Sequence, residues 1–152
     1  MPLQLMIIAA WLAAGARASA TLCAAFPSAC DGSFAGGAIV VDGNATIGGT
    51  IPTELGQLPG LQEVRLLRCR LSGTVPSEVG RLTALQNLGL AASALSGTVP
   101  VEVAGLSELE NLYLYETSLS GTTPTQLGVL GALHLVDLDT TCLLYTSPSP
   151  RD

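Results

Sequence analysis

Three consecutive segments of equal length decide the fold of this chain: LQEVRLLRCRLSGTVPSEVGRLTA (61–84), LQNLGLAASALSGTVPVEVAGLSE (85–108) and LENLYLYETSLSGTTPTQLGVLGA (109–132), followed by the incomplete LHLVDLDTT (133–141). Each contains a phrase that ends in proline, and an earlier phrase of this kind, GGTIP, covers residues 48–52. The prolines therefore lie 24 residues apart at every step, at Pro52, Pro76, Pro100 and Pro124. A fixed period of this length indicates a repeat array.

Leucine and valine recur at four positions of the repeat. The columns are Leu61/Leu85/Leu109/Leu133, Val64/Leu88/Leu112/Val136, Leu66/Leu90/Leu114/Leu138 and Leu71/Leu95/Leu119. This arrangement resembles the plant-type leucine-rich repeat, L-x-x-L-x-L-x-x-N-x-L-x-G-x-I-P-x-x-L-G-x-L-x-x, over about two thirds of the chain. The resemblance implies an α/β solenoid with a parallel β-sheet on its concave face and short helical, 3-10 or irregular segments on its convex face.

Side-chain alternation explains the same pattern in physical terms. Val64 and Leu66 are predicted to face the core from a short strand whose other side is in water. The phrase SGTVP (72–76) supplies turn residues, and a return segment follows with Val79 and Leu82 at helical spacing. Because no repeat buries its apolar face alone, neighbours stack, and their strands are expected to form one parallel sheet.

Residues 1–20 are predicted to be a signal peptide. An apolar run from Leu3 to Ala14 precedes small residues that fit a signal-peptidase site, so cleavage is placed after Ala20, with Ala18 as the alternative. The run is shorter than the stretch of about 20 apolar residues that spans a bilayer. Its start carries no Lys or Arg, which leaves a buried helix or a signal anchor as alternatives.

Residues 21–46 are interpreted as an N-terminal cap, with Ala38 to Val41 as its strand, because the first repeat would otherwise expose its core. Cys23 and Cys30 lie close in sequence and are predicted to form a disulfide in an exported chain. A redox or metal pair is the alternative, although no C-x-x-C motif is present. Asn44 begins the glycosylation sequon NAT. The leucine-rich repeats are expected over residues 47–141.

The ninth repeat position departs from the family pattern. Asn is usual there, but this chain has Cys69, Ser93, Thr117 and Thr141. Hydroxyl groups still donate and accept hydrogen bonds at a buried turn. Cys69 is predicted to be a buried thiol, because the three strands that separate it from Cys142 amount to about 14 Å, too far for a disulfide.

Residues 142–152, CLLYTSPSPRD, are expected to interrupt the repeat after Thr141. They resemble the in-frame translation of a sequencing-library adaptor, and all eleven residues match. The segment is therefore predicted to be an artefact, with the natural protein continuing beyond Thr141. A Ser/Pro-rich tail or linker is the alternative.

The water-facing side of the predicted sheet supplies the candidate ligand contacts. Its side chains align in two columns, Arg65/Gly89/Tyr113/Asp137 and Leu67/Ala91/Tyr115/Asp139. Tyr and Arg are enriched at interface hot spots. The candidates are Arg65, Arg68, Tyr113, Tyr115, Asp137 and Asp139. The alternative is that these are ordinary solvated positions. On the convex side, Glu54, Glu78 and Glu102 form a second column, interpreted as a solubility face.

Several function classes are disfavoured by composition. The net charge is −6, with six Arg and no Lys, so nucleic-acid binding is not expected. His134 is the only histidine and has no nucleophile motif beside it, so no catalytic residue is assigned. Asp137 and Asp139 share one strand face, but calcium takes about 6 to 8 oxygen ligands. No enzyme activity, metal or cofactor is predicted.

Three functions remain open from the sequence. The favoured one is the extracellular recognition domain of a receptor-like protein, attached to a membrane only through a segment beyond Thr141. A secreted binder, similar to the polygalacturonase-inhibitor kind of repeat protein, is the second, and a structural or adhesive surface protein is the third. All three place the chain outside the cell, secreted or at the cell surface, with a protein or peptide ligand or, as a further candidate, a cell-wall glycan.

Overall fold

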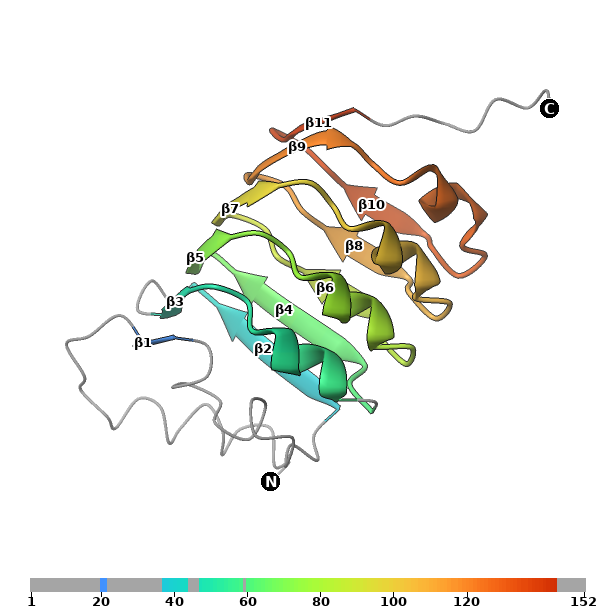
Figure 1. Cartoon of the computed structure of the whole chain (residues 1–152), viewed down its shortest axis with the longest axis horizontal. Coiled ribbons are helices and arrows are strands. Elements are labelled where there is room, and N and C mark those ends of the chain that lie inside the picture. The colour runs from blue at the N-terminus through green and yellow to red at the C-terminus, as the bar shows by residue number, and fades with distance from the viewer. Residues whose placement is uncertain (1–19, 22–36, 44–46, 59, 145–152) are drawn as a thin grey trace.

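The chain coils into a stack of similar turns, each passing through two strands and one 3-10 helix (Figure 1). This computed structural model describes residues 20–21, 37–43, 47–58 and 60–144. Within them, the first sheet has five parallel strands in the order β10-β8-β6-β4-β2. These are β2 (Ala38–Asp42), β4 (Glu63–Leu67), β6 (Asn87–Gly89), β8 (Asn111–Tyr113) and β10 (Leu135–Asp137). Neighbouring repeats pair at the same repeat position, for example Val64 with Leu88.

A second parallel sheet runs alongside the first, in the order β1-β3-β5-β7-β9-β11. Its strands are β1 (Ala20–Thr21), β3 (Ile47–Gly49), β5 (Arg70–Gly73), β7 (Ala94–Gly97), β9 (Ser118–Thr122) and β11 (Cys142–Leu144). The expectation of a single sheet, with Ser72 and Gly73 in a turn, is therefore wrong. Leu71 is buried and its neighbours are not, so the segment alternates as a strand does, and it ends at Gly73, where φ is +81°.

Short 3-10 helices close each turn. They are η1 (Thr53–Gln57), η2 (Ser77–Arg81), η3 (Val101–Gly105) and η4 (Thr125–Val129). Proline precedes each helix, and the backbone bonds span three residues, as from Val79 N to Pro76 O (3.2 Å) and from Leu82 N to Val79 O (3.1 Å). Val79 and Leu82 are buried, which confirms the predicted return segment.

The core is filled by the columns of leucine and valine. The first three members of each predicted column are at most 2% exposed. Burial of one such side chain stabilises the fold by about 1.5–3 kcal/mol. At the C-terminal end the corresponding side chains of Leu133, Val136 and Leu138 are only partly buried. Protection from water thus declines toward β10.

Hydroxyl groups at the ninth repeat position satisfy the backbone inside the turn, as predicted. Ser93 Oγ donates to Leu90 O at 2.8 Å, and Thr117 Oγ1 donates to Leu114 O at 2.8 Å. Cys69, 4% exposed, donates through Sγ to Leu67 O at 3.4 Å. The residue just before each of these positions adopts a left-handed conformation, with φ between 51° and 55°; these residues are Arg68, Ala92, Glu116 and Thr140.

The repeat was expected to be interrupted after Thr141, but strand pairing continues for three more residues. Strand β11 pairs with β9, and Cys142 lies opposite Ser120. Leu143 stands 24 residues after Leu119 and packs against the core, so it occupies the leucine column. The adaptor origin of residues 142–152 stays a prediction, because strand pairing does not depend on where a sequence comes from.

Some expected features fall outside the described residues. These are the predicted signal segment before Ala20, the disulfide between Cys23 and Cys30, the sequon at Asn44 and the tail after Leu144. The strand predicted from Ala38 to Val41 is observed as β2, which pairs with β4 along its whole length, and its role as a cap stays a prediction. In the part of the chain that the structure describes, no helix is long and apolar enough to cross a membrane.

A candidate ligand-binding face on the first sheet

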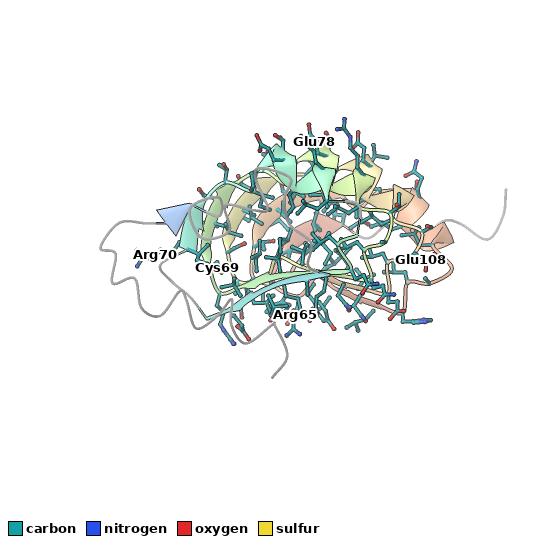
Figure 2. The ribbon with its side chains drawn as sticks, turned by 90° about the horizontal axis from the view of Figure 1, so that it is seen from below. Arg65, Cys69, Arg70, Glu78 and Glu108 are labelled. Atoms are coloured by element: carbon teal, nitrogen blue, oxygen red, sulfur yellow. The ribbon has the colours of Figure 1, made fainter. Side chains whose placement is uncertain are left out.

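The outer face of the first sheet lies opposite the 3-10 helices. Figure 2 shows Arg65 on this face and Glu78 of η2 on the other side of the molecule. The strand register places Arg65 beside Gly89, Gly89 beside Tyr113, and Tyr113 beside Asp137. The predicted column is therefore confirmed across four adjacent strands.

A hollow of about 440 Å³ opens on this face, and the sequence analysis missed it. Its lining consists of Glu63, Arg65, Leu67, Asn87, Tyr113, Tyr115 and Asp137. Between its long side chains lie two small buried residues, Gly89 and Ala91. The longer side chains on β4 and those on and near β8 lie on either side of β6. The two strands are about 10 Å apart, which is two strand spacings. Adjacent small residues between two columns of long ones are the signal that could have revealed it.

Two residues of the second predicted column are buried rather than exposed. Ala91 is 0% exposed and Leu67 is 9% exposed. The side chain of Leu67 leans toward the neighbouring strand, where a Cβ at Gly89 would lie 3.2 Å from Leu67 Cδ2. Leu67 can lie flat because its neighbour is glycine, so it forms part of the floor of the hollow.

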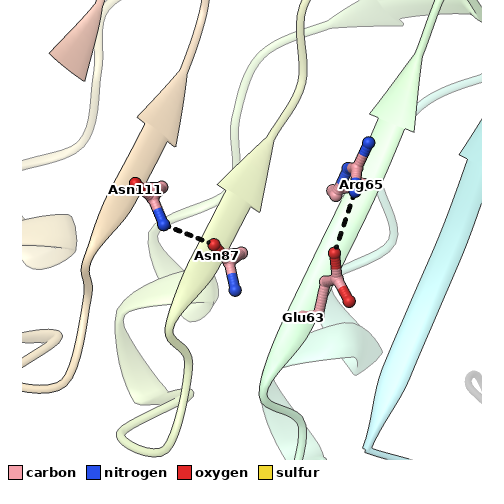
Figure 3. Close-up of polar contacts among 4 residues, drawn as sticks. All are labelled: Glu63, Arg65, Asn87 and Asn111. Atoms are coloured by element: carbon pink, nitrogen blue, oxygen red, sulfur yellow. Dashed lines mark hydrogen bonds and ion pairs between the residues drawn. The ribbon is translucent and has the colours of Figure 1, made fainter. Parts of the chain in front are cut away.

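Both arginines of the face are already paired within the chain. Arg65 Nη1 donates to Glu63 Oε1 at 3.3 Å (Figure 3), and Arg68 Nη2 donates to Asp42 Oδ1 at 2.6 Å. Arg68 does not line the hollow, and nor does Asp139. Of the six predicted contact residues, the hollow thus brings together Arg65, Tyr113, Tyr115 and Asp137.

Two asparagine side chains, those of Asn87 and Asn111, form a hydrogen-bonded pair at the edge of the hollow. Asn111 Nδ2 donates to Asn87 Oδ1 at 2.7 Å, between equivalent positions of neighbouring repeats (Figure 3). Among the described residues, the Nδ2 group of Asn87 and the Oδ1 atom of Asn111 have no further partner. The NH2 group of Asn87 and the carbonyl oxygen of Asn111 therefore remain as a donor group and an acceptor for a ligand, which is the complement of a peptide group.

The far wall is aromatic and acidic. Tyr113 and Tyr115 are half-buried, and their hydroxyls make no hydrogen bond within the described part of the chain. Asp137 Oδ1 accepts from Asp139 N at 3.2 Å, while Asp139 Oδ1 accepts from Thr140 N at 3.0 Å. In each carboxylate, one oxygen thus accepts a local hydrogen bond, and the other makes none within the described part of the chain.

The side chains on this face offer little basis for catalysis. His134 is exposed, its backbone N–H donates to Glu110 O at 2.8 Å, and it does not line the hollow. Across the described ranges, no group of three or more His, Cys, Asp or Glu side chains is placed to hold a metal ion. The geometry is suited to binding.

Comparison with known proteins identifies the fold. No family model matches the chain, and no curated protein matches it. Among solved structures, the ectodomain of the receptor kinase SOBIR1 from Arabidopsis thaliana aligns with a TM-score of 0.67 and 26% identity, over 74% of this chain and 60% of that one. The Arabidopsis receptor kinase HAESA, in complex with the peptide hormone IDA and the co-receptor SERK1, aligns with a TM-score of 0.63 and 34% identity, over 68% and 18%. A plant ice-binding protein aligns with a TM-score of 0.66 and 30% identity, over 70% and 34%.

The chain is therefore a leucine-rich repeat solenoid, with the fold of plant receptor ectodomains. It spans between 18% and 60% of the length of these three solved chains. The predicted plant-type repeat pattern and the predicted fold class are both confirmed.

Proposed function

We propose that this chain is the extracellular ligand-recognition part of a receptor-like protein and that it binds a peptide across the outer face of the first sheet. The observation that carries the proposal is the hollow, which places Arg65, Tyr113, Tyr115 and Asp137 around one space. A rigid sheet that presents aromatic side chains around a concavity loses little entropy on binding. The HAESA complex supports the proposal, since it is a protein of this fold bound to a peptide hormone.

The fold alone does not decide the function, because the plant ice-binding protein has it as well. A secreted inhibitor or an adhesive protein would use the same scaffold. The leftover donor and acceptor of the Asn87–Asn111 pair can bind a peptide backbone, which is the ligand that we propose. In this proposal, residues beyond this chain would attach the protein to a membrane and would form any domain on the far side of it.

A displayed library of random peptides, panned on the immobilised full chain, tests the proposal. The affinity of each selected peptide is then measured for the chain and for the double variant Tyr113→Ala/Tyr115→Ala. Loss of two hot-spot aromatics is expected to weaken binding by at least about 30-fold, equivalent to about 2 kcal/mol. Val101→Ser is the control, because Val101 is 54% exposed on η3, away from the first sheet.

Peptides that bind the double variant as tightly as the unchanged chain would place the ligand site elsewhere and contradict the proposal. Far-UV circular dichroism of both variants shows that the fold is retained, so that a loss of binding is assigned to the site.

A further inference from the structure

We infer that the ligand is a basic peptide, and that it inserts an Arg or Lys side chain into the hollow against Tyr113 and Asp137. This inference rests on the proposed function and names the chemistry of its partner. Within the described part of the chain, side chains on the outer face of the first sheet remain partly exposed, and their charge distribution is what selects one kind of occupant.

Charge is divided unevenly along the solenoid. At the N-terminal end of the face, Arg65 is neutralised by Glu63 and Arg68 by Asp42. Beyond Arg81, no Arg or Lys occurs before residue 145, and among the described residues the acidic groups of the later repeats form no ion pair. On and beside the sheet these groups are Glu110, Glu116, Asp137 and Asp139. A ligand that spans the face therefore meets a neutral end and an anionic end.

The hollow itself is matched to a cation. Its charged lining consists of Glu63, Arg65 and Asp137, and the first two form an ion pair, so the remaining charge is that of Asp137. The face of a tyrosine ring attracts a cation, by about 0.5–2 kcal/mol. A guanidinium group stacked beside Tyr113 would also donate to the unused oxygen of Asp137. A carboxylate in the same place would meet a like charge.

The backbone of such a peptide has a place beside the cation. Asn87 offers its NH2 group as a donor and Asn111 its carbonyl oxygen as an acceptor, next to Tyr113 and on the same two strands. A peptide lying across the strands would cover the about 10 Å from β4 to β8 with roughly three extended residues. One anchoring cation and a few backbone contacts thus fit the dimensions of the face.

Three synthetic peptides that differ in one residue type test the inference: acetyl-GSRGRSG-amide, acetyl-GSQGQSG-amide and acetyl-GSEGESG-amide. Each is titrated into the full chain at low and physiological salt, and binding is followed by chemical shifts of the tyrosine rings. The Arg peptide is expected to bind at least about tenfold more tightly than the Gln peptide, since a charge-assisted hydrogen bond is involved, and the Glu peptide is expected to be weakest. Raising the salt concentration should weaken the binding of the Arg peptide only.

The variant Asp137→Asn keeps the acceptor oxygen that Asp139 N uses and removes the charge. It should weaken the Arg peptide by about tenfold, whereas Glu102→Gln, on exposed η3, should have no effect. Equal losses in both variants would mean general attraction to an acidic protein and would overturn the inference. If peptides selected from the library depend on Tyr113 and Tyr115 but are acidic or neutral, the inference fails and the proposed function stands. If no peptide depends on the tyrosines, both fail.

Discussion

At the scale of single residues, the ninth repeat position shows which property of asparagine the fold requires. Ser93, Thr117 and Thr141 each donate to the carbonyl three residues earlier, at 2.7–2.8 Å. One short hydroxyl donor therefore satisfies the inward turn, and an amide is not needed. Cys69 supplies only a thiol, a weaker donor, at 3.4 Å.

Replacement of Thr117 by valine, which has nearly the same shape, tests the importance of this bond. Thr117 is 8% exposed and bonds Leu114 O at 2.8 Å, so Thr117→Val leaves a buried carbonyl without its donor. The free energy of unfolding is expected to fall by about 1–3 kcal/mol in urea titrations. Ser120→Ala is the control, since Ser120 is exposed and its 3.5 Å bond to Gly97 O is long; a change below about 0.5 kcal/mol is expected. Equal losses of unfolding free energy in the two variants would show that burial does not decide the cost of losing the hydrogen bond.

Residue by residue, the sequence predicts inward positions better than outward ones. The leucine columns follow directly from the period, because an apolar side chain that recurs every 24 residues must face the shared core. Outward positions depend on the size of neighbours on other strands. Leu67 was predicted to be exposed and is buried, because Gly89 beside it leaves room for its side chain to lie flat.

At the scale of elements, the 3-10 helices approach one another more closely than side chains allow. A Cβ on Gly80 would lie 2.7 Å from the carbonyl carbon of Glu102 in the next helix, and Gly56 meets Glu78 in the same way. Glycine at this position thus sets the spacing between η1 and η2 and between η2 and η3, whereas η3 itself has Ala104 there. The backbone of η3 has to shift before any side chain fits on η2 at Gly80.

Gly80→Ala and Gly105→Ala form a matched pair for this effect. Both residues lie in 3-10 helices, but a Cβ on Gly105 would meet no described atom closer than Gly80 O at 3.8 Å. Gly80→Ala is expected to lower the free energy of unfolding by about 1–3 kcal/mol through overpacking. Gly105→Ala should change it by less than about 0.5 kcal/mol. Thermal and urea unfolding measure both, and an equal loss would contradict the close-contact explanation.

The second sheet is the element that the sequence did not predict. Ser72, Gly73 and Thr74 are frequent turn residues, and their chemistry was given more weight than the buried Leu71 before them. Stacking overrides this preference. Ser72 Oγ donates to Gly49 O of the preceding repeat at 3.4 Å, and Ser96 Oγ donates likewise to Gly73 O. Such contacts between repeats cannot be inferred from one repeat alone.

At the scale of the whole molecule, stability is expected to differ along the solenoid, because each repeat contacts only its neighbours. Leu90 is 1% exposed in the second repeat, while Leu138, at the equivalent position of the last one, is only partly buried. Amide exchange should therefore be slowest in the middle strands and faster at β10 and β11.

Leu90→Ala and Leu138→Ala compare the two environments with identical chemistry. Leu90→Ala is expected to cost about 2–5 kcal/mol, because it leaves a cavity in a close-packed core. Leu138→Ala should cost less than half as much, since its site already contacts water. Urea unfolding monitored by circular dichroism gives both values. A larger loss for Leu138→Ala would mean that the last repeat, and not the middle, holds the solenoid together.

The hollow between β4 and β8 has a consequence for how binding specificity can change. It lies where two small residues, Gly89 and Ala91, separate longer side chains on either side, and the strands on both sides of β6 pair with it at the same repeat positions. Exchanging small and large residues between repeats would move the concavity along the sheet in steps of about 4.8 Å without inserting or deleting any residue. A lineage of such chains can therefore diversify its ligands by point substitution alone, while the scaffold that carries them stays constant.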